Sequence, residues 1–164
     1  IHSGLRSIGT SALRASIRSV MSRASLFGGL ALGNSGLGAV HGIAGPLGGR
    51  IPIPHGAACA ALLAPTVRVN IRALVKRDPG NPALARYGWA ADLVTGKTTA
   101  GPEDLVYVLE FLSLDLGLPS LAYWGLTEAD IPQLAADALA SSSMKGNPIL
   151  LESADVEEII RQAL

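Results

Sequence analysis

Residues 24–49 form a run of 26 residues without a single Asp, Glu, Lys or Arg. The run is long enough for a membrane-spanning helix. Nine of its residues are Gly, however, and polar residues and a Pro interrupt the apolar ones. Glycine allows two backbones to approach closely. The run therefore predicts a buried helical segment at a close packing contact, and its length leaves a membrane span open as the alternative.

Pro and Gly residues separate helical patterns along the rest of the chain, and no stretch alternates with a period of two. Asn81 before Pro82 is typical of a helix start, and Thr127–Asp130 matches a capping box. Predicted helices cover about 4–22, 24–41, 55–76 with a kink or break at Pro65, 82–95, 102–117, 127–140 and 154–164 after a Ser153 cap, with an irregular segment at 42–54. The pattern predicts an all-α fold of six to eight helices in a single domain over residues 1–164.

The amino-acid composition limits which binding partners and which cellular compartment are expected. Thirteen Lys and Arg balance thirteen Asp and Glu. A chain with zero net charge has no broad basic surface for phosphates, which argues against a nucleic-acid partner. The single cysteine, Cys59, excludes an internal disulfide framework and suits a reducing compartment. A cytoplasmic location is therefore expected. Residues 5–23 also resemble a transit peptide, being rich in Arg and Ser and free of acids, but an amphipathic helix on a core is favoured.

His41 and His55 are the candidate metal ligands. They are fourteen residues apart, each is next to a Gly, and both lie in or beside the charge-free run. The connection 42–54 can fold both rings toward one point. The spacing also fits two hydrogen-bonded core histidines, because a buried imidazole without a partner costs about 1–3 kcal/mol. A catalytic metal has about three protein ligands and an open position, and residues 24–54 contain no carboxylate. Any further metal ligands must therefore come from outside residues 24–54.

Other candidates are weaker. Cys59 follows His55 by four residues, on the same helix face, and either a ligand or nucleophile role or an inert buried thiol fits, the latter being favoured. Asn34 is expected to pack and Lys145 to lie in a solvated turn. The sequence has neither a dinucleotide-binding fingerprint nor a nucleophile elbow.

Three motifs together resemble one family. They are Leu-Gly-Asn-Ser-Gly-Leu-Gly-Ala-Val-His-Gly-Ile-Ala-Gly-Pro-Leu-Gly-Gly at 32–49, Pro-His-Gly at 54–56 and Gly-Asn-Pro at 146–148. With the final Ile-Ile-x-x-Ala-Leu, they are similar to the helical C-terminal domain of the iron-containing alcohol dehydrogenase family. The resemblance runs from about residue 24 to residue 164.

The resemblance implies a helical bundle of the dehydroquinate synthase-like and iron-dehydrogenase type. It implies that His41 and His55 bind Fe²⁺, or Zn²⁺ as in some members. The metal would polarise the oxygen of a small alcohol, aldehyde or ketone while hydride moves to or from NAD(P). A homo-oligomer, such as a dimer, without a membrane partner is also expected.

Three departures from the family pattern bear on these expectations. The family's N-terminal nucleotide-binding domain has no counterpart in this sequence. Its remaining ligands, an Asp and a His one helical turn apart, would precede residue 1, and His2 lacks the matching Asp. Gly45 stands where many members have a further His. We expect a fragment that alone binds metal weakly or not at all and does not turn over. The competing interpretations are a helical scaffold with structural histidines and a membrane-associated helical protein.

Overall fold

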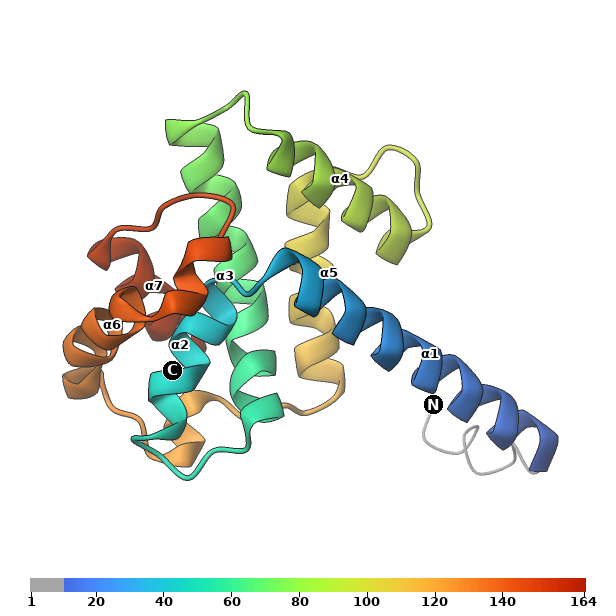
Figure 1. Ribbon diagram of the computed structural model, residues 1–164, viewed down its shortest axis with the longest axis horizontal. Coiled ribbons are helices and arrows are strands. Elements are labelled where there is room, and N and C mark those ends of the chain that lie inside the picture. The colour runs from blue at the N-terminus through green and yellow to red at the C-terminus, as the bar shows by residue number, and fades with distance from the viewer. Residues whose placement is uncertain (1–10) are drawn as a thin grey trace. The chain divides into compact units, whose positions relative to one another are not determined.

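The computed structural model describes residues 11–164, and every regular element in that range is a helix (Figure 1). The prediction of an all-α fold is confirmed. Residues 1–10 lie outside the described range, and so do His2 and the start of the helix predicted at 4–22.

Seven α-helices and three 3₁₀ turns are described. They are α1 (Ser11–Ser35), α2 (Ala39–Gly48), α3 (His55–Arg77), α4 (Pro82–Thr95), α5 (Pro102–Asp115), η2 (Leu121–Trp124), η3 (Glu128–Asp130), α6 (Ile131–Ala140), η4 (Ser142–Gly146) and α7 (Ser153–Ala163). The chain divides into two compact units, Ile1–Gly36 and Leu37–Leu164. A single domain over residues 1–164 therefore stays a prediction.

The predicted division between helices at residues 22–24 is wrong. α1 continues to Ser35, and the chain turns at Gly36, whose φ of 75° is the left-handed conformation that glycine adopts readily. The prediction of a central helix over 24–41 is also wrong, because residues 24–35 are exposed along α1. The charge-free run is therefore shared between α1 and α2, and no single described helix spans it.

Two prolines lie inside regular helices, although the sequence predicts an irregular segment at the first and a kink or break at the second. α2 continues through Pro46 to Gly48, and α3 continues through Pro65 to Arg77. A proline inside a helix costs about 3 kcal/mol because it removes a hydrogen bond and crowds the preceding turn. In α3 the residues on both sides of Pro65 are buried, so core packing offsets that cost.

The ends of the later helices follow the local signals closely. α4 begins at Pro82 and ends at Thr95 as predicted, and the Ala83 amide donates to Asn81 Oδ1 at 2.9 Å. The Thr127 amide donates to Asp130 Oδ2 at 2.9 Å, as a capping box requires. One cap differs from the prediction. Ser153 is the first residue of α7, and the cap is Glu152, whose amide donates to Asp155.

α3 is the central helix of the second unit, with α2, α6 and α7 to one side and α4 and α5 to the other (Figure 1). One face, which includes Leu62, Val69 and Ala73, packs into the larger core with α2, α6 and α7. The other face, which includes Val67 and Ile71, packs into a smaller core with α4 and α5. α3 is also the one described helix that is long and apolar enough to cross a membrane. The most apolar part of α3 is 61% buried, as in the core helix of a soluble protein.

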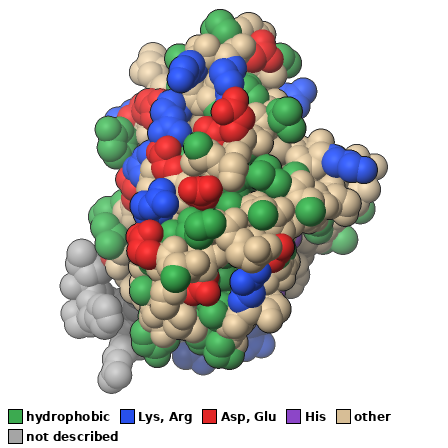
Figure 2. Space-filling model, turned by 90° about the vertical axis from the view of Figure 1, so that its left-hand side faces the viewer, with side chains coloured by type: hydrophobic (Ala, Val, Ile, Leu, Met, Phe, Trp, Pro, Cys, Tyr) green, Lys and Arg blue, Asp and Glu red, His purple; other side chains and the backbone are tan. Residues whose placement is uncertain are grey.

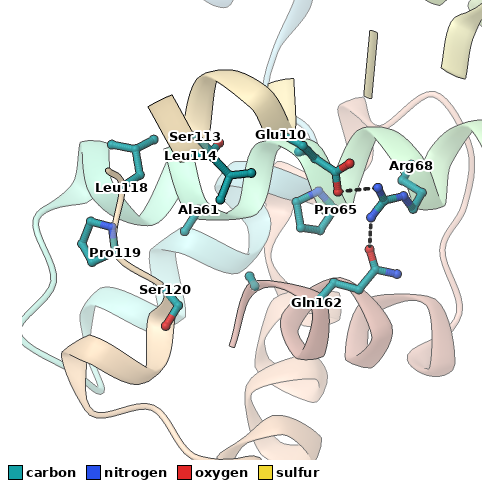
Figure 3. A pocket seen from close by; sticks show the side chains of 12 residues that line it. Ala61, Pro65, Arg68, Glu110, Ser113, Leu114, Leu118, Pro119, Ser120 and Gln162 are labelled. Atoms are coloured by element: carbon teal, nitrogen blue, oxygen red, sulfur yellow. Dashed lines mark hydrogen bonds and ion pairs between the residues drawn. The ribbon is translucent and has the colours of Figure 1, made fainter. Parts of the chain in front are cut away.

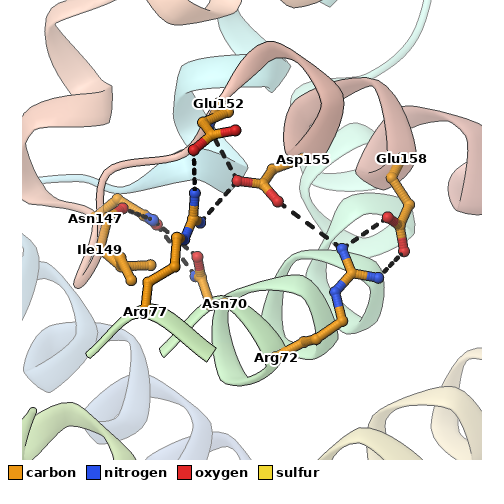
Figure 4. Close-up of polar contacts among 8 residues, drawn as sticks. All are labelled: Asn70, Arg72, Arg77, Asn147, Ile149, Glu152, Asp155 and Glu158. Carbon is orange, nitrogen blue, oxygen red and sulfur yellow. Dashed lines mark hydrogen bonds and ion pairs between the residues drawn. The ribbon is translucent and has the colours of Figure 1, made fainter. Parts of the chain in front are cut away.

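Charged side chains of both signs are intermixed on the face shown in Figure 2. Between α3 and α7 they form direct pairs (Figure 4). Arg72 donates two hydrogen bonds to Glu158, one of them at 2.7 Å, and Arg77 Nη2 donates to Asp155 at 2.7 Å. These pairs hold α7 against the helix that begins at His55.

We expect Glu158→Gln to lower stability by about 1 kcal/mol or less, because the pair with Arg72 is partly exposed. The hydrogen bond from Arg72 lowers the pKa of Glu158 below its ordinary 4.5. The stabilisation is therefore complete above pH 4.5 and is lost as pH falls through the lower pKa of the folded state. Urea denaturation between pH 3 and 7 should show the two proteins converging at low pH. A constant difference across that range would contradict this origin.

Candidate metal centre

The two candidate histidines lie at the starts of consecutive helices. His55 is the first residue of α3, as predicted. His41 lies in the first turn of α2, not near the end of a helix as predicted, because the glycines at 36 and 38 end α1 early. α2 and α3 pack against each other through the larger core.

The connection between α2 and α3 is a tight turn. The Arg50 amide donates to the Leu47 carbonyl at 2.9 Å, and the Ile53 amide donates to the Ile51 carbonyl at 2.8 Å. Ile53 is buried in the larger core. The turn thereby fixes the direction in which the chain enters α3 at His55.

The structure brings both imidazoles together, with a third donor beside them. The ring centroids of His41 and His55 are 5.4 Å apart, and the planes are tilted by 48°. Cys59, one turn after His55, places its Sγ 3.5 Å from His55 Nε2. One ligand atom from each of the three residues lies within 4.8 Å of the others.

This donor set fits a divalent metal ion. Nitrogen and sulfur ligands bind zinc at about 2.0–2.3 Å, so tetrahedral ligand atoms lie about 3.3–3.8 Å apart. The 3.5 Å between Cys59 Sγ and His55 Nε2 lies in that range, and the three ligand atoms lie within 4.8 Å of one another. His55 is exposed, while His41 and Cys59 are half-buried. An ion can therefore reach the site from solvent.

Cys59 is not the fully buried thiol that the sequence favoured, because it is half-buried and lies against His55. Partial burial raises the pKa of the Cys59 thiol above its ordinary value, since desolvation disfavours the thiolate. In the metal-free chain the thiol is therefore protonated at neutral pH.

A cavity of about 450 Å³ adjoins the histidine pair. His41 and Cys59 border it, and Ala60, Leu63 and Val67 form apolar walls. Thr66 also lines it. Its Oγ1 is buried and has no hydrogen-bond partner among residues 11–164. A buried hydroxyl without a partner is costly, so this oxygen suits a bound water or a polar ligand atom.

Two asparagines join the start of α2 to α3 (Figure 4). Asn147 Nδ2 donates to Asn70 Oδ1 and to the Ile149 carbonyl, both at 2.8 Å. Asn147 Oδ1 accepts from the Ala39 amide and from Asn70 Nδ2, both at 3.2 Å. Every donor and acceptor of the Asn147 amide is used, so this side chain anchors α2 two residues before His41.

Sequence reasoning missed Thr66 and Asn70, and it noted Asn147 only within a family motif. A polar residue inside an apolar helix was the one available signal for Thr66 and Asn70. Asn34 donates to the Leu30 carbonyl of its own helix, and Lys145 is exposed. Gly45 is exposed too, with nothing within 4 Å of the place where a Cβ would stand.

A second cavity, of about 410 Å³, lies at α3, α5 and α7 (Figure 3). Its charged groups satisfy one another. Arg68 pairs with Glu110 and also donates to Gln162 Oε1 at 3.0 Å. This cavity therefore lacks a free charged group from that cluster to hold a ligand.

Known proteins with similar sequences are alcohol dehydrogenases. The chain is 36% identical over 152 residues to 1,3-propanediol dehydrogenase of Klebsiella pneumoniae, covering 89% of the chain and 37% of that protein. It is 30% identical over 149 residues to NAD-dependent methanol dehydrogenase of Bacillus methanolicus, covering 90% and 38%. The chain thus spans less than two-fifths of the length of these relatives.

Solved structures agree with the sequence comparison. A crystal structure of 1,3-propanediol oxidoreductase matches with a TM-score of 0.75 at 33% identity, over 88% of this chain and 37% of that one. Alcohol dehydrogenase from Oenococcus oeni matches with a TM-score of 0.78 at 28% identity, over 94% and 40%. The sequence profile for the C-terminal part of the Fe-containing alcohol dehydrogenase family matches residues 1–164. The chain belongs to the Fe-containing alcohol dehydrogenase family and corresponds to its helical C-terminal part.

Proposed function

We propose that this chain is the metal-binding helical part of an NAD(P)-dependent alcohol dehydrogenase or carbonyl reductase, with His41 and His55 as two of the metal ligands. The observation that carries the proposal is the convergence of these imidazoles, which come from different helices, within 4.8 Å. Family membership adds the class of chemistry. Imidazole nitrogen suits both Fe²⁺ and Zn²⁺, so either ion fits this pair.

A divalent ion bound there would supply a Lewis acid to polarise the substrate oxygen during hydride transfer with NAD(P). The histidines would hold and orient that ion. The apolar walls of the adjoining cavity, formed by Ala60, Leu63 and Val67, exclude water from the substrate's carbon atoms. The unpartnered hydroxyl of Thr66 offers a hydrogen bond to a substrate oxygen or to a water.

The proposed substrate is a small alcohol, aldehyde or ketone, because the cavity is small and largely apolar. Relatives named for 1,3-propanediol and methanol support this class. A homo-oligomer and a cytoplasmic location belong to the same proposal. Large apolar side chains exposed along α1, such as Phe27 and Leu30, support the first. The single free cysteine supports the second.

Zn²⁺ binding tests the histidine pair. We expect His41→Ala and His55→Ala each to weaken Zn²⁺ binding by the chain at least about tenfold, because each removes a ligand atom. Equilibrium dialysis followed by metal analysis measures this. His2→Ala is the control for adventitious binding to imidazole, since the chain has three histidines.

We expect His2→Ala to bind Zn²⁺ as the unaltered chain does. If the double variant His41→Ala/His55→Ala retains the Zn²⁺ of the unaltered chain while its unfolding midpoint falls, the histidines are structural. The alternative of a non-catalytic helical scaffold then replaces the proposed function.

A further inference from the structure

We propose that Cys59 is a third metal ligand, so that this chain binds a divalent ion through two imidazoles and one thiolate. This inference rests on the proposed function, because it takes His41 and His55 as ligands. It adds a soft sulfur donor from the second turn of α3.

The helix register places the sulfur correctly. Cys59 follows His55 by four residues, and side chains at this spacing lie above one another on the same helix face. Paired ligands at positions i and i+4 of a helix are an established way to bind zinc. α3 is regular through this turn, so the pairing does not depend on a flexible loop.

The distance between the two donors on α3 matches a shared ion. Bonds of about 2.0 Å to nitrogen and 2.3 Å to sulfur, meeting at the tetrahedral angle, put the two ligand atoms about 3.5 Å apart. The observed separation between Cys59 Sγ and His55 Nε2 is 3.5 Å. His41 supplies the third donor from α2, within 4.8 Å of both.

Exposure and charge also suit a metal site. The cluster is open to solvent at His55 and half-buried at the other two residues, so an ion can enter while part of the site is dry. Binding displaces the thiol proton to solvent, and the resulting thiolate neutralises one charge of the ion. Thiolate is a soft ligand that favours Zn²⁺ over Fe²⁺. This set of three donors therefore favours Zn²⁺ over Fe²⁺ in this chain.

The competing explanation of the short contact is an S–H to imidazole hydrogen bond that has no part in metal binding. Co²⁺ separates the two, because it takes Zn²⁺ sites and its absorption reports its ligands. A thiolate ligand produces intense near-ultraviolet charge transfer, whereas nitrogen and oxygen ligands leave only weak visible bands. The chain has one cysteine, so any thiolate signal comes from Cys59.

The experiment is a Co²⁺ titration of the 164-residue chain and of variants whose folding is checked by circular dichroism. We expect charge transfer that saturates with one Co²⁺ per chain and is abolished by added Zn²⁺. Cys59→Ser and Cys59→Ala should lose it and weaken Co²⁺ binding at least about tenfold. A matched control, Cys59→Ala with Leu63→Cys, moves the thiol four residues, about 6 Å, along the helix axis. It should also lack charge transfer.

Two outcomes would overturn the inference, and they differ in what they say of the histidines. Visible Co²⁺ bands without charge transfer would show that the histidine pair binds metal without Cys59, which leaves the proposed function in place. Absence of both signals in the folded chain would show that these three residues do not hold an ion by themselves, and that the histidines bind metal only together with the family's further Asp and His ligands.

Discussion

Replacing Gly146 with Ala is expected to destabilise the second unit by about 3 kcal/mol or more and to weaken metal binding at the same time. A Cβ at residue 146 would stand 1.9 Å from the Leu37 carbonyl oxygen and 3.0 Å from its carbonyl carbon. Both atoms belong to backbone, so no side-chain rotation relieves the clash. Overpacking of this kind costs about 1–3 kcal/mol, and more where the backbone must move.

The substitution should also weaken metal binding, because the clash lies next to the start of α2, the helix that carries His41. Leu37 lies two residues before the start of α2, and Gly146 precedes Asn147, which binds the Ala39 amide. Separating these segments displaces the first turn of α2 and with it His41. We therefore expect Co²⁺ or Zn²⁺ affinity to fall together with the urea midpoint, although residue 146 is not a ligand.

Gly45→Ala is the matched control, since Gly45 lies within α2 and a Cβ there meets nothing within 4 Å. It should leave metal affinity unchanged and raise stability by up to about 1 kcal/mol, because alanine favours a helix more than glycine does. If Gly146→Ala behaves like Gly45→Ala in urea denaturation, the close approach of residues 37 and 146 does not set the position of α2.

The helix limits that depend on neighbouring residues could be predicted from the sequence. Asn81 with Pro82 determined the start of α4, and Thr127 with Asp130 formed the expected capping box. The paths through Pro46 and Pro65 could not, because a local rule that ends a helix at proline takes no account of tertiary packing. Pro65, for example, lies between the buried residues Ala64 and Thr66. The break at Gly36 was missed because a glycine-rich apolar run contains many equivalent places to turn.

The candidate site likewise contains some features that the sequence predicts and others that only the fold shows. The sequence pointed to His41 and His55 through their glycine neighbours and the turn between them, and the structure brings these rings together. Their role as metal ligands stays a prediction. The Asn70–Asn147 contact joins residues 77 apart in sequence, and nothing local to either residue indicates the other. Only the tertiary fold shows which buried amides satisfy each other.

That amide pair is the basis of the second large effect. Asn147→Ala should destabilise the chain by about 2–4 kcal/mol, because it leaves the buried Ala39 amide and the Oδ1 atom of Asn70 without partners. A buried group left unpaired costs about 1–3 kcal/mol. Asn147→Asp keeps the acceptor for Ala39 but removes both donors, so it should be similarly destabilising at neutral pH.

A double-mutant cycle separates the contact from other effects of each substitution. Asn70→Ala alone also loses the hydrogen bond to Tyr87 at 3.2 Å. The double variant should be less destabilised than the sum of the singles, by about 1–2 kcal/mol, because residues in one hydrogen-bond network are not additive. Asn34→Ala is the control. Its amide is exposed and bonds within its own helix, so the change should be within about 0.5 kcal/mol.

The position of His41 links this cycle to metal binding. Asn147 holds the Ala39 amide, and His41 follows within the same turn of α2. Zn²⁺ affinity should therefore fall for Asn147→Ala but not for Asn34→Ala, measured under conditions in which both proteins are fully folded. Additive effects in the cycle, with Zn²⁺ affinity unchanged, would mean that the core packing of Ile43 and Leu47 alone fixes α2. A coupled loss would show that an amide pair, remote in sequence, positions a metal ligand.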